Sequence, residues 1–210
     1  MAQKAGPYGF RIAKMLGDVP FSGGIHTIPL NVTNTYAFYF GDPLGLSGGN
    51  PVALTASPVP PATYLAAATA NNPIGIFMGC SYQDPKMGFV NDQFLPANAA
   101  GLGYTNIQIK VFDSPSAVMQ IQANGIVTVD KIGMNAGLTG FHGGNAQIKN
   151  SVCVVDTATV GTAVGAVRIY DFVYTPSPAP GMSSQPGDPF TDLLVIWAPG
   201  VHRYAVSQGL

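Results

Sequence analysis

The sequence predicts an all-β protein, a barrel or sandwich of short antiparallel strands preceded by an extended N-terminal arm. The 210 residues include 26 Gly and 18 Pro, which break helices, and no glutamate, which is a good helix former on protein surfaces. Short runs of β-branched and aromatic residues recur between clusters of turn-forming residues. The chain shows no repeat of fixed period, so a solenoid or a propeller is not expected.

Residues 1–24 are expected to form the arm, because Gly and Pro interrupt them repeatedly and their apolar residues keep no sustained period. Residues 1–17 carry three basic groups and no acid, a charge of +3, whereas the rest of the chain carries six basic groups and ten Asp, a charge of −4. An extended arm cannot bury its own aromatic side chains, so it should lie on its body or on a neighbour. The arm residues expected to bind a partner are Lys4, Tyr8, Phe10, Arg11 and Lys14.

Residues 25–210 are expected to form a single β-rich body. Its first candidate strands are 25–30, 35–40, 52–55 and 62–69, with turn clusters at 31–34, 41–51 and 57–61. The clearest buried strand is 74–82, a nearly continuous apolar run with a hairpin partner expected in 86–95. A short helix is expected at 97–101. Ile107, Ile109 and Val111 alternate with polar residues, the pattern of a half-buried strand.

In the second half of the body, Asn124-Gly125 predicts a hairpin turn between strands at 117–123 and 126–132. The alternative there is a helix that begins at Ser114-Pro115, with Pro at its first position. Residues 133–144 contain five glycines and are expected to be a surface loop. Further strands are expected at 151–156, 166–174 and 190–198, and the Pro-rich loop 175–189 is expected to be a contact surface.

Charged residues make up only 9% of the chain, against about 25% in typical soluble domains. A surface with so few charges is poorly protected against association with other proteins. Nine Lys and Arg are too few for the phosphate contacts that dominate nucleic-acid affinity, so nucleic acid is not an expected partner. No apolar stretch approaches the roughly 18 residues of a spanning helix, and no membrane partner is expected.

The sequence offers little for catalysis. GLSGG at 45–49 matches the G-x-S-x-G pattern of hydrolases, but Asn50-Pro51 follows at once and disfavours the helix that such a nucleophile turn requires. A Gly-rich turn is expected, and a hydrolase built on Ser47 is the alternative. The histidines belong to no metal-binding pattern, and Asp188 and Asp192 flank a Pro in a loop, where turn capping explains them. No catalytic, metal-binding or cofactor-binding residue is therefore expected.

The two cysteines, Cys80 and Cys153, lie far apart in apolar runs and match no metal or redox spacing. They are expected to be buried, reduced thiols that act as small hydrophobic residues.

Segments that cover most of the chain resemble a known class of protein. They are GFRIAK at 9–14, LGD at 16–18, FGDP at 40–43, GIFMGCSYQDP at 75–85, QIQANG at 120–125, IGMNA at 132–136, VRIYDFV at 167–173 and PGDPFTD at 186–192. Together they resemble the structural proteins of tailed bacteriophages, especially short-tailed ones, that lie on the capsid exterior as decoration or cement proteins. None of these motifs is catalytic.

The resemblance implies a non-enzymatic virion protein that is assembled in the host cytoplasm and decorates or cements the capsid exterior. Its partners would be the major capsid protein and further copies of itself in a homo-oligomer. The alternative is a phage tail or host-recognition protein that binds glycans through aromatic residues gathered on a loop with Asn or Asp. The aromatic candidates for that role are Trp197 and Tyr204, although Trp197 lies in an expected core strand.

Overall fold

The computed structural model describes residues 6–17, 19–21, 23–57, 72–145, 147–161, 165–174 and 185–205. The fold is antiparallel β. The helical segments of the described residues are short 3₁₀ turns, η1 at Ala100–Leu102, η2 at Val129–Lys131 and η3 at Arg203–Ala205. The all-β prediction is therefore confirmed.

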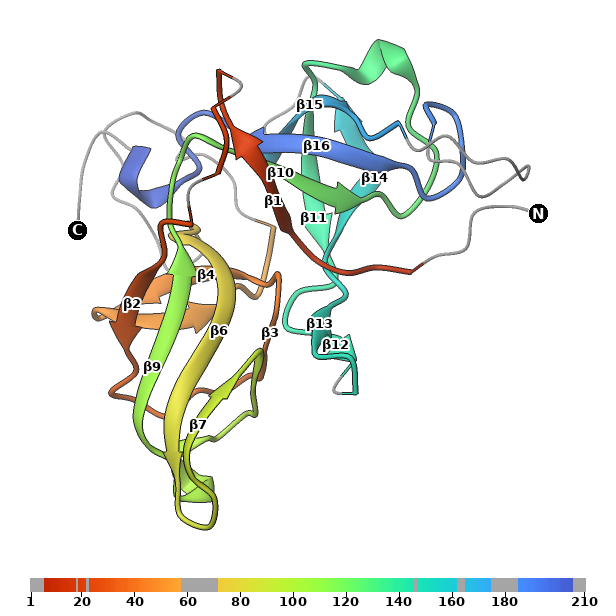
Figure 1. The fold of residues 1–210 in the computed structure, drawn as a ribbon. Helices are drawn as coiled ribbons and strands as arrows, with labels where there is room; N and C mark the ends of the chain where they lie inside the picture. Colours follow the sequence, from red (N-terminus) through yellow and green to blue (C-terminus); the bar gives the residue numbers. More distant parts are fainter. Residues whose placement is uncertain are drawn as a thin grey trace.

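Two six-stranded sheets form two lobes, which Figure 1 shows one above the other. The upper lobe has the strand order β1-β10-β16-β15-β11-β14. These strands are β1 (Arg11–Met15), β10 (Ala117–Gln122), β16 (Asp192–Trp197), β15 (Val167–Phe172), β11 (Asn135–Thr139) and β14 (Val154–Gly161). An isolated parallel bridge between Ala123 and Val155 joins the end of β10 to β14, so the upper sheet curls back on itself.

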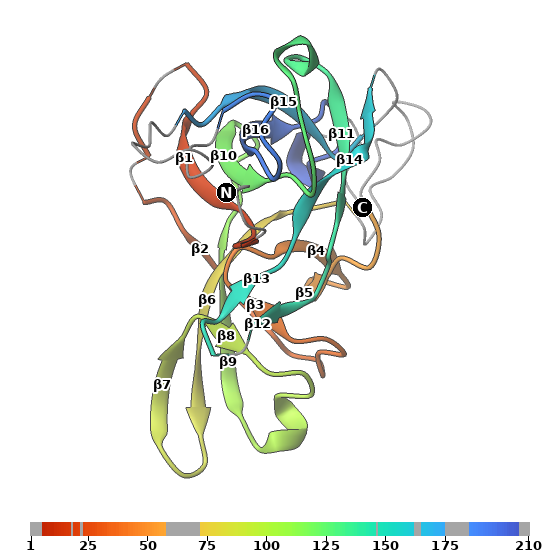
Figure 2. The ribbon, with the colours of Figure 1, turned by 90° about the vertical axis from the view of Figure 1, so that its right-hand side faces the viewer.

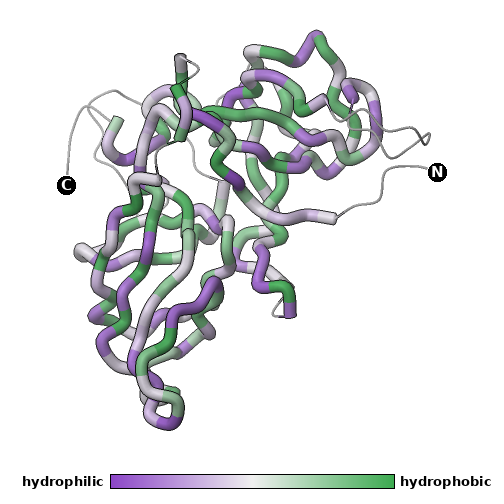
Figure 3. Tube along the Cα trace, in the orientation of Figure 1, coloured by the Kyte–Doolittle hydropathy of each residue, from purple (hydrophilic) through white to green (hydrophobic). Residues whose placement is uncertain are grey.

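The lower lobe has the strand order β2-β9-β6-β4-β5, and β7 pairs with β6. Its strands are β2 (His26–Pro29), β9 (Thr105–Phe112), β6 (Gly75–Asp84), β4 (Pro43–Ser47), β5 (Asn50–Ala53) and β7 (Gly88–Asp92). The long strands β6 and β9 run the length of this lobe, and the β6–β7 hairpin reaches its far end (Figure 1). Hydrophobic and hydrophilic residues alternate along β9 (Figure 3), as in strands with one buried face, whereas β6 is buried along most of its length.

Each lobe has its own hydrophobic core. Phe10, Met119, Ile169 and Trp197 belong to the upper cluster, while the lower cluster contains Phe38, Leu44, Phe77 and Ile109. The predicted single body from residue 25 to 210 thus contains two hydrophobic clusters in its described part.

The lobes meet at a waist, defined by residues 8–10, 39–42 and 149–153, where three distant segments cross (Figure 2). The N–H of Phe10 donates to the Gly41 carbonyl at 2.9 Å, and the N–H of Ser151 donates to the Phe40 carbonyl at 3.0 Å. Two short pairs, β3 (Phe38–Tyr39) with β8 (Phe94–Leu95) and β12 (Gly144–Asn145) with β13 (Asn150–Ser151), border the waist. These contacts join the upper lobe to the lower one.

The extended N-terminal arm is not confirmed. Arg11–Met15 forms β1, which pairs with β10 from Arg11 opposite Gln120 to Met15 opposite Ala117. Ile12 and Met15 pack against the upper cluster, which gives the segment the apolar contacts that its sequence period did not reveal. The first strand therefore completes a sheet whose other strands lie a hundred or more residues later in the sequence, between residues 117 and 197.

The strand predicted at 117–123 is confirmed by β10, which excludes the helix alternative, but the hairpin predicted at Asn124-Gly125 is wrong. β10 pairs with β1 and β16, and the residues after the turn contain η2. Asn124 is bound to β14 instead: its N–H donates to the Val155 carbonyl at 3.0 Å, and its Oδ1 accepts from the Thr157 N–H at 2.9 Å. Asn124 thus links the end of β10 to β14, where a local turn was expected.

The loop predicted at 133–144 is also wrong, because it contains β11, a strand between β15 and β14. Ala136 and Leu138 are buried, and the Gly137 N–H donates to the Thr159 hydroxyl at 2.7 Å. A Cβ at Gly137 would lie 2.9 Å from that oxygen, so glycine permits the close approach.

The turn cluster predicted at 41–51 contains strands that the sequence reading missed. β4 and β5 form a hairpin around Gly48-Gly49, whose φ angles of +54° and +79° suit a tight two-residue turn. GLSGG therefore forms a Gly-rich hairpin turn, as expected, and no helix follows it.

Other predictions hold. β6, its hairpin partner β7, the alternating strand β9, β15 and β16 lie where the sequence placed them. Cys80 and Cys153 are buried free thiols, as expected. The candidate strand at 62–69 and most of the Pro-rich loop at 175–189 lie outside the described residues.

Candidate functional site

The far end of the lower lobe carries an apolar tip, defined by Met87, Phe89 and Leu102. Met87 is 71% exposed, Phe89 70% and Leu102 52%. Met87 and Phe89 come from the β6–β7 hairpin, and Leu102 comes from η1, which lies beside the hairpin at the lower end of Figure 1. The two parts are joined at their base, where the ring of Tyr82 from β6 stacks on that of Tyr104, which follows η1, at a centroid distance of 4.4 Å. Large exposed apolar side chains gathered in one place mark an interaction surface.

The hairpin that presents the tip is stiffened by its own turn. Asp84 Oδ1 accepts hydrogen bonds from the N–H groups of Lys86 at 2.7 Å and Met87 at 2.9 Å. These bonds lower the pKa of the Asp84 carboxyl, since they stabilise its charged form. Gly88 closes the turn with a φ of +80°, the left-handed conformation that a three-residue hairpin loop needs. Met87 is therefore held outward by local structure.

The second edge of β7 adds main-chain groups to this surface. Among the described strands, β7 pairs only with β6, from Cys80 opposite Asp92 to Asp84 opposite Gly88. An edge strand can accept a strand from another protein. Sequence reasoning predicted this hairpin but not its exposed tip, for which the apolar Met87 inside a D-P-x-x-G turn was the available signal.

The arm residues are placed on the chain's own upper lobe. Phe10 is fully buried, with its ring centroid 5.5 Å from that of Trp197. The Tyr8 hydroxyl donates to Asp192 Oδ1 at 2.8 Å, and burial, with the nearby Asp192 charge, raises the pKa of Tyr8. In this fold Phe10 is held in the core and is not available to a partner.

The basic arm residues also contact their own lobe. The Arg11 guanidinium lies 4.4 Å from the centre of the Tyr8 ring, and Lys14 Nζ lies 5.2 Å from the centre of the Tyr170 ring. Arg11 stays exposed at the surface. Partner binding by Arg11 and Lys14 stays a prediction, and Lys4 lies outside the described residues.

The waist contains a buried carboxyl that the sequence analysis did not single out. Asp42 is 1% exposed, its Oδ2 accepts from the Tyr39 N–H at 2.9 Å, and its Oδ1 has no hydrogen-bond partner among the described residues. Burial raises the pKa of Asp42 to about 7, although the Ser151 hydroxyl and the Tyr39 N–H partly oppose the rise. A group in this state titrates near neutral pH.

The three histidines occupy separate places in the fold. His26 Nδ1 lies 3.0 Å from Asp113 Oδ2. His142 stacks on Tyr36, and His202 is buried beside Trp197. Burial lowers the pKa of His202 to about 4, so its ring is neutral at pH 7. The described residues hold no group of three or more His, Cys or Asp side chains placed to bind a metal ion.

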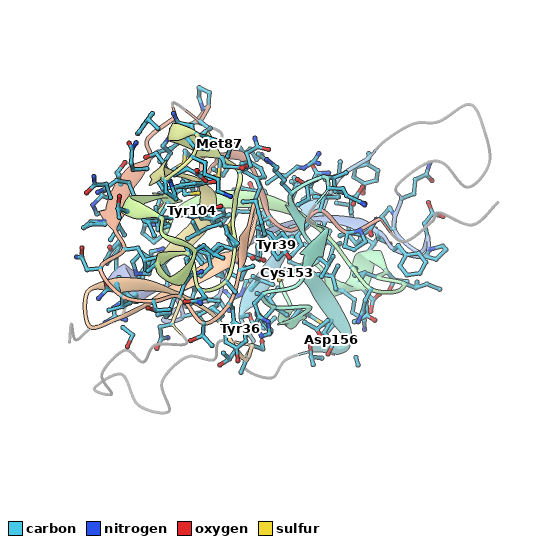
Figure 4. All side chains as sticks on the ribbon, turned by 90° about the horizontal axis from the view of Figure 1, so that it is seen from below. Tyr36, Tyr39, Met87, Tyr104, Cys153 and Asp156 are labelled. Carbon is cyan, nitrogen blue, oxygen red and sulfur yellow. The ribbon has the colours of Figure 1, made fainter. Side chains whose placement is uncertain are left out.

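Both thiols are held in the un-ionised form. Burial raises the pKa of Cys80 to about 12, and burial raises the pKa of Cys153 well above its ordinary value. Figure 4 shows Cys153 and Tyr39 near the middle of the view, with Met87 and Tyr36 toward opposite edges. A buried, protonated thiol is a poor nucleophile and a poor metal ligand.

Comparisons of this chain with protein-family models, with curated proteins and with solved structures found no match. Within the described residues, no helix has the length and apolar character needed to cross a membrane.

Proposed function

We propose that this chain is a non-enzymatic virion protein that decorates or cements a bacteriophage capsid by binding neighbouring shell subunits from the outside. The observation that carries the proposal is the apolar tip on its stiff hairpin, next to the open edge of β7. Its partners are the major capsid protein and further copies of the chain in a homo-oligomer, and assembly takes place in the host cytoplasm. The segments that resemble capsid decoration proteins support the same role.

The physical properties of the tip suit a protein partner. Burying a large apolar side chain contributes about 1.5–3 kcal/mol, so Met87 and Phe89 together supply several kcal/mol before the costs of association are subtracted. The open edge of β7 can add main-chain hydrogen bonds of fixed direction, which orient the bound protein. Because a capsid repeats the same site many times, a modest contact of this kind suffices to cover a shell.

The alternative role, in a tail or in glycan recognition, loses its first candidate site. Trp197 is buried in β16, next to Phe10, so the Trp197–Tyr204 pair does not form an exposed aromatic surface.

The test is binding to shells assembled from the major capsid protein that is encoded with this chain, measured by cosedimentation. The variant is Met87→Ser/Phe89→Ser, and its matched control is Ile126→Ser, which alters a 60% exposed apolar residue outside the tip. We expect the double variant to bind about tenfold more weakly or worse, while the control binds like the wild type. Wild-type occupancy in the double variant, with its fold intact by circular dichroism, would contradict the proposed anchor; absence of binding by the wild type would contradict the proposed function.

A further inference from the structure

A cleft of about 270 Å³ opens on the lower lobe, away from the apolar tip. The loop of residues 31–36 forms one wall, and the β4–β5 hairpin forms the other, with Ser47, Pro51 and Val52 among its residues. Neither the arm nor the tip contributes a residue to it. Its volume is at the lower end of ligand sites, so it would hold one small ring and leave the rest of a ligand in solvent.

The walls of the cleft are fixed by hydrogen bonds. Asn34 is buried, and its Nδ2 donates to the carbonyls of Tyr36 and Pro96 at 2.9 and 2.8 Å, while its Oδ1 accepts from the Ala99 N–H at 3.0 Å. The Asn31 N–H donates to Asn50 Oδ1 at 2.9 Å, which ties the loop to the facing hairpin. The cleft is therefore preformed, and a ligand would not need to order it.

An aromatic side chain lines the cleft and remains partly open to solvent. Tyr36 is 39% exposed, and its ring stacks on His142 at a centroid distance of 4.1 Å and an angle of 18°. His142 lies in the loop between β11 and β12, so a second segment of the chain packs against the Tyr36 ring. Figure 4 places Tyr36 at the edge of the molecule, on the side opposite Met87.

The chemistry of the lining is uncharged and mixed. Aliphatic residues and residues with a hydroxyl group line the cleft together. The residues with a hydroxyl group include Thr33, Thr35, Ser47 and Thr55. No Asp, Lys, Arg or His is among its described lining residues, so nothing there compensates the charge of an anion or a cation. A ligand that suits these walls has an apolar ring face for an aromatic side chain and neutral hydroxyl groups around its rim.

We propose that this cleft binds a neutral sugar in its pyranose form, through the Tyr36 ring and the surrounding hydroxyl groups. A pyranose presents C–H groups on one face and hydroxyl groups at its edge, which matches the aromatic and polar parts of the lining. The inference does not rest on capsid binding, because the cleft and the apolar tip share no residue. A capsid-bound copy would keep the cleft free to hold a sugar at the particle surface.

The test uses saturation-transfer NMR and calorimetry on the full chain, with methyl glycosides of glucose, galactose and mannose as probes. We expect at least one to bind saturably, with a dissociation constant on the order of 1 mM. Tyr36→Ala is expected to weaken this binding about tenfold or more, and Tyr36→Phe is expected to bind like the wild type. Tyr174→Ala removes an exposed tyrosine elsewhere on the chain and serves as the matched control. Inorganic phosphate is expected not to compete.

Two results would overturn the proposal. One is the absence of saturable binding by all three glycosides at concentrations on the order of 50 mM, well above the expected dissociation constant. The other is binding that survives both Tyr36→Ala and Val52→Trp, the second of which fills the cleft from its opposite wall. Thermal unfolding of each variant shows whether it is folded, and a folded Tyr36→Ala that loses the sugar while Tyr36→Phe keeps it supports the site.

Discussion

Replacing Asp42 by asparagine removes the one buried carboxyl of the waist that lacks a partner for one of its oxygens among the described residues. Asparagine has almost the same shape and cannot ionise, and its Oδ1 can accept the Tyr39 N–H that Asp42 accepts now. The variant is therefore expected to be more stable than the wild type at neutral and alkaline pH, and nearly equal to it in acid.

The magnitude follows from the pKa of Asp42, which burial raises from 3.8 to about 7. Between these values the folded chain holds a proton that the unfolded chain has lost, so the free energy of unfolding falls as the pH rises. Each unit of difference in pKa corresponds to about 1.4 kcal/mol, and the loss amounts to roughly 4 kcal/mol above pH 7. Asp42→Asn is expected to abolish that loss.

His202 adds a slope of the opposite sign. Burial lowers its pKa from 6.5 to about 4, so between these values the unfolded chain binds a proton that the folded chain does not. Its contribution is present above pH 6.5 and is lost as the pH falls through 4. The two slopes offset each other in the wild type between about pH 4 and 6.5. In Asp42→Asn the histidine slope is no longer offset by Asp42, and the free energy of unfolding should rise more with pH there than it does in the wild type.

The assay is urea unfolding followed by fluorescence of Trp197, the single tryptophan of the chain, at pH values from about 4 to 8. Asp130→Asn is the control, because Asp130 is exposed and should leave the profile of the wild type unchanged in shape. A profile for Asp42→Asn with the same dependence on pH as the wild type would refute the assignment of this slope to Asp42.

Three further outcomes are expected. Phe10→Ala should lower the free energy of unfolding by about 3–5 kcal/mol, because it empties a fully buried site in the upper core; a change below about 1 kcal/mol, measured by urea unfolding, would mean that the site is exposed in solution. Gly41→Ala should prevent stable folding or strongly lower the midpoint of thermal unfolding, since φ is +89° and the new Cβ would lie 2.8 Å from the Phe10 carbonyl oxygen. A midpoint equal to that of the wild type would argue against the packing described at the waist. Cys80 and Cys153 should react with a thiol reagent only after denaturation, and rapid labelling of both in the native protein would contradict their burial.

Local signals along the chain were enough to predict the fold class and several of the strands. The apolar run of β6 and the alternation in β9 are each visible within a few positions of the chain. The scarcity of helix-forming surface residues is visible in the composition. The burial of Cys80 and Cys153 also followed from their immediate neighbours. The exposed tip was not foreseen, because exposure of Met87 depends on what the rest of the fold leaves uncovered.

Strand pairing and the burial of polar groups depend instead on contacts between segments that lie far apart in the chain. β1 is stabilised by β10, about a hundred residues away. Asn124 accepts a hydrogen bond from Thr157 of β14, although the Asn124-Gly125 pair predicted a local hairpin turn. β11 lies within the Gly-rich segment 133–144, yet it is a strand because β14 and β15 supply its hydrogen bonds from both sides. Pairing between distant segments overrides weak local preferences, and for this reason β1, the waist and the cleft could not be predicted from the sequence.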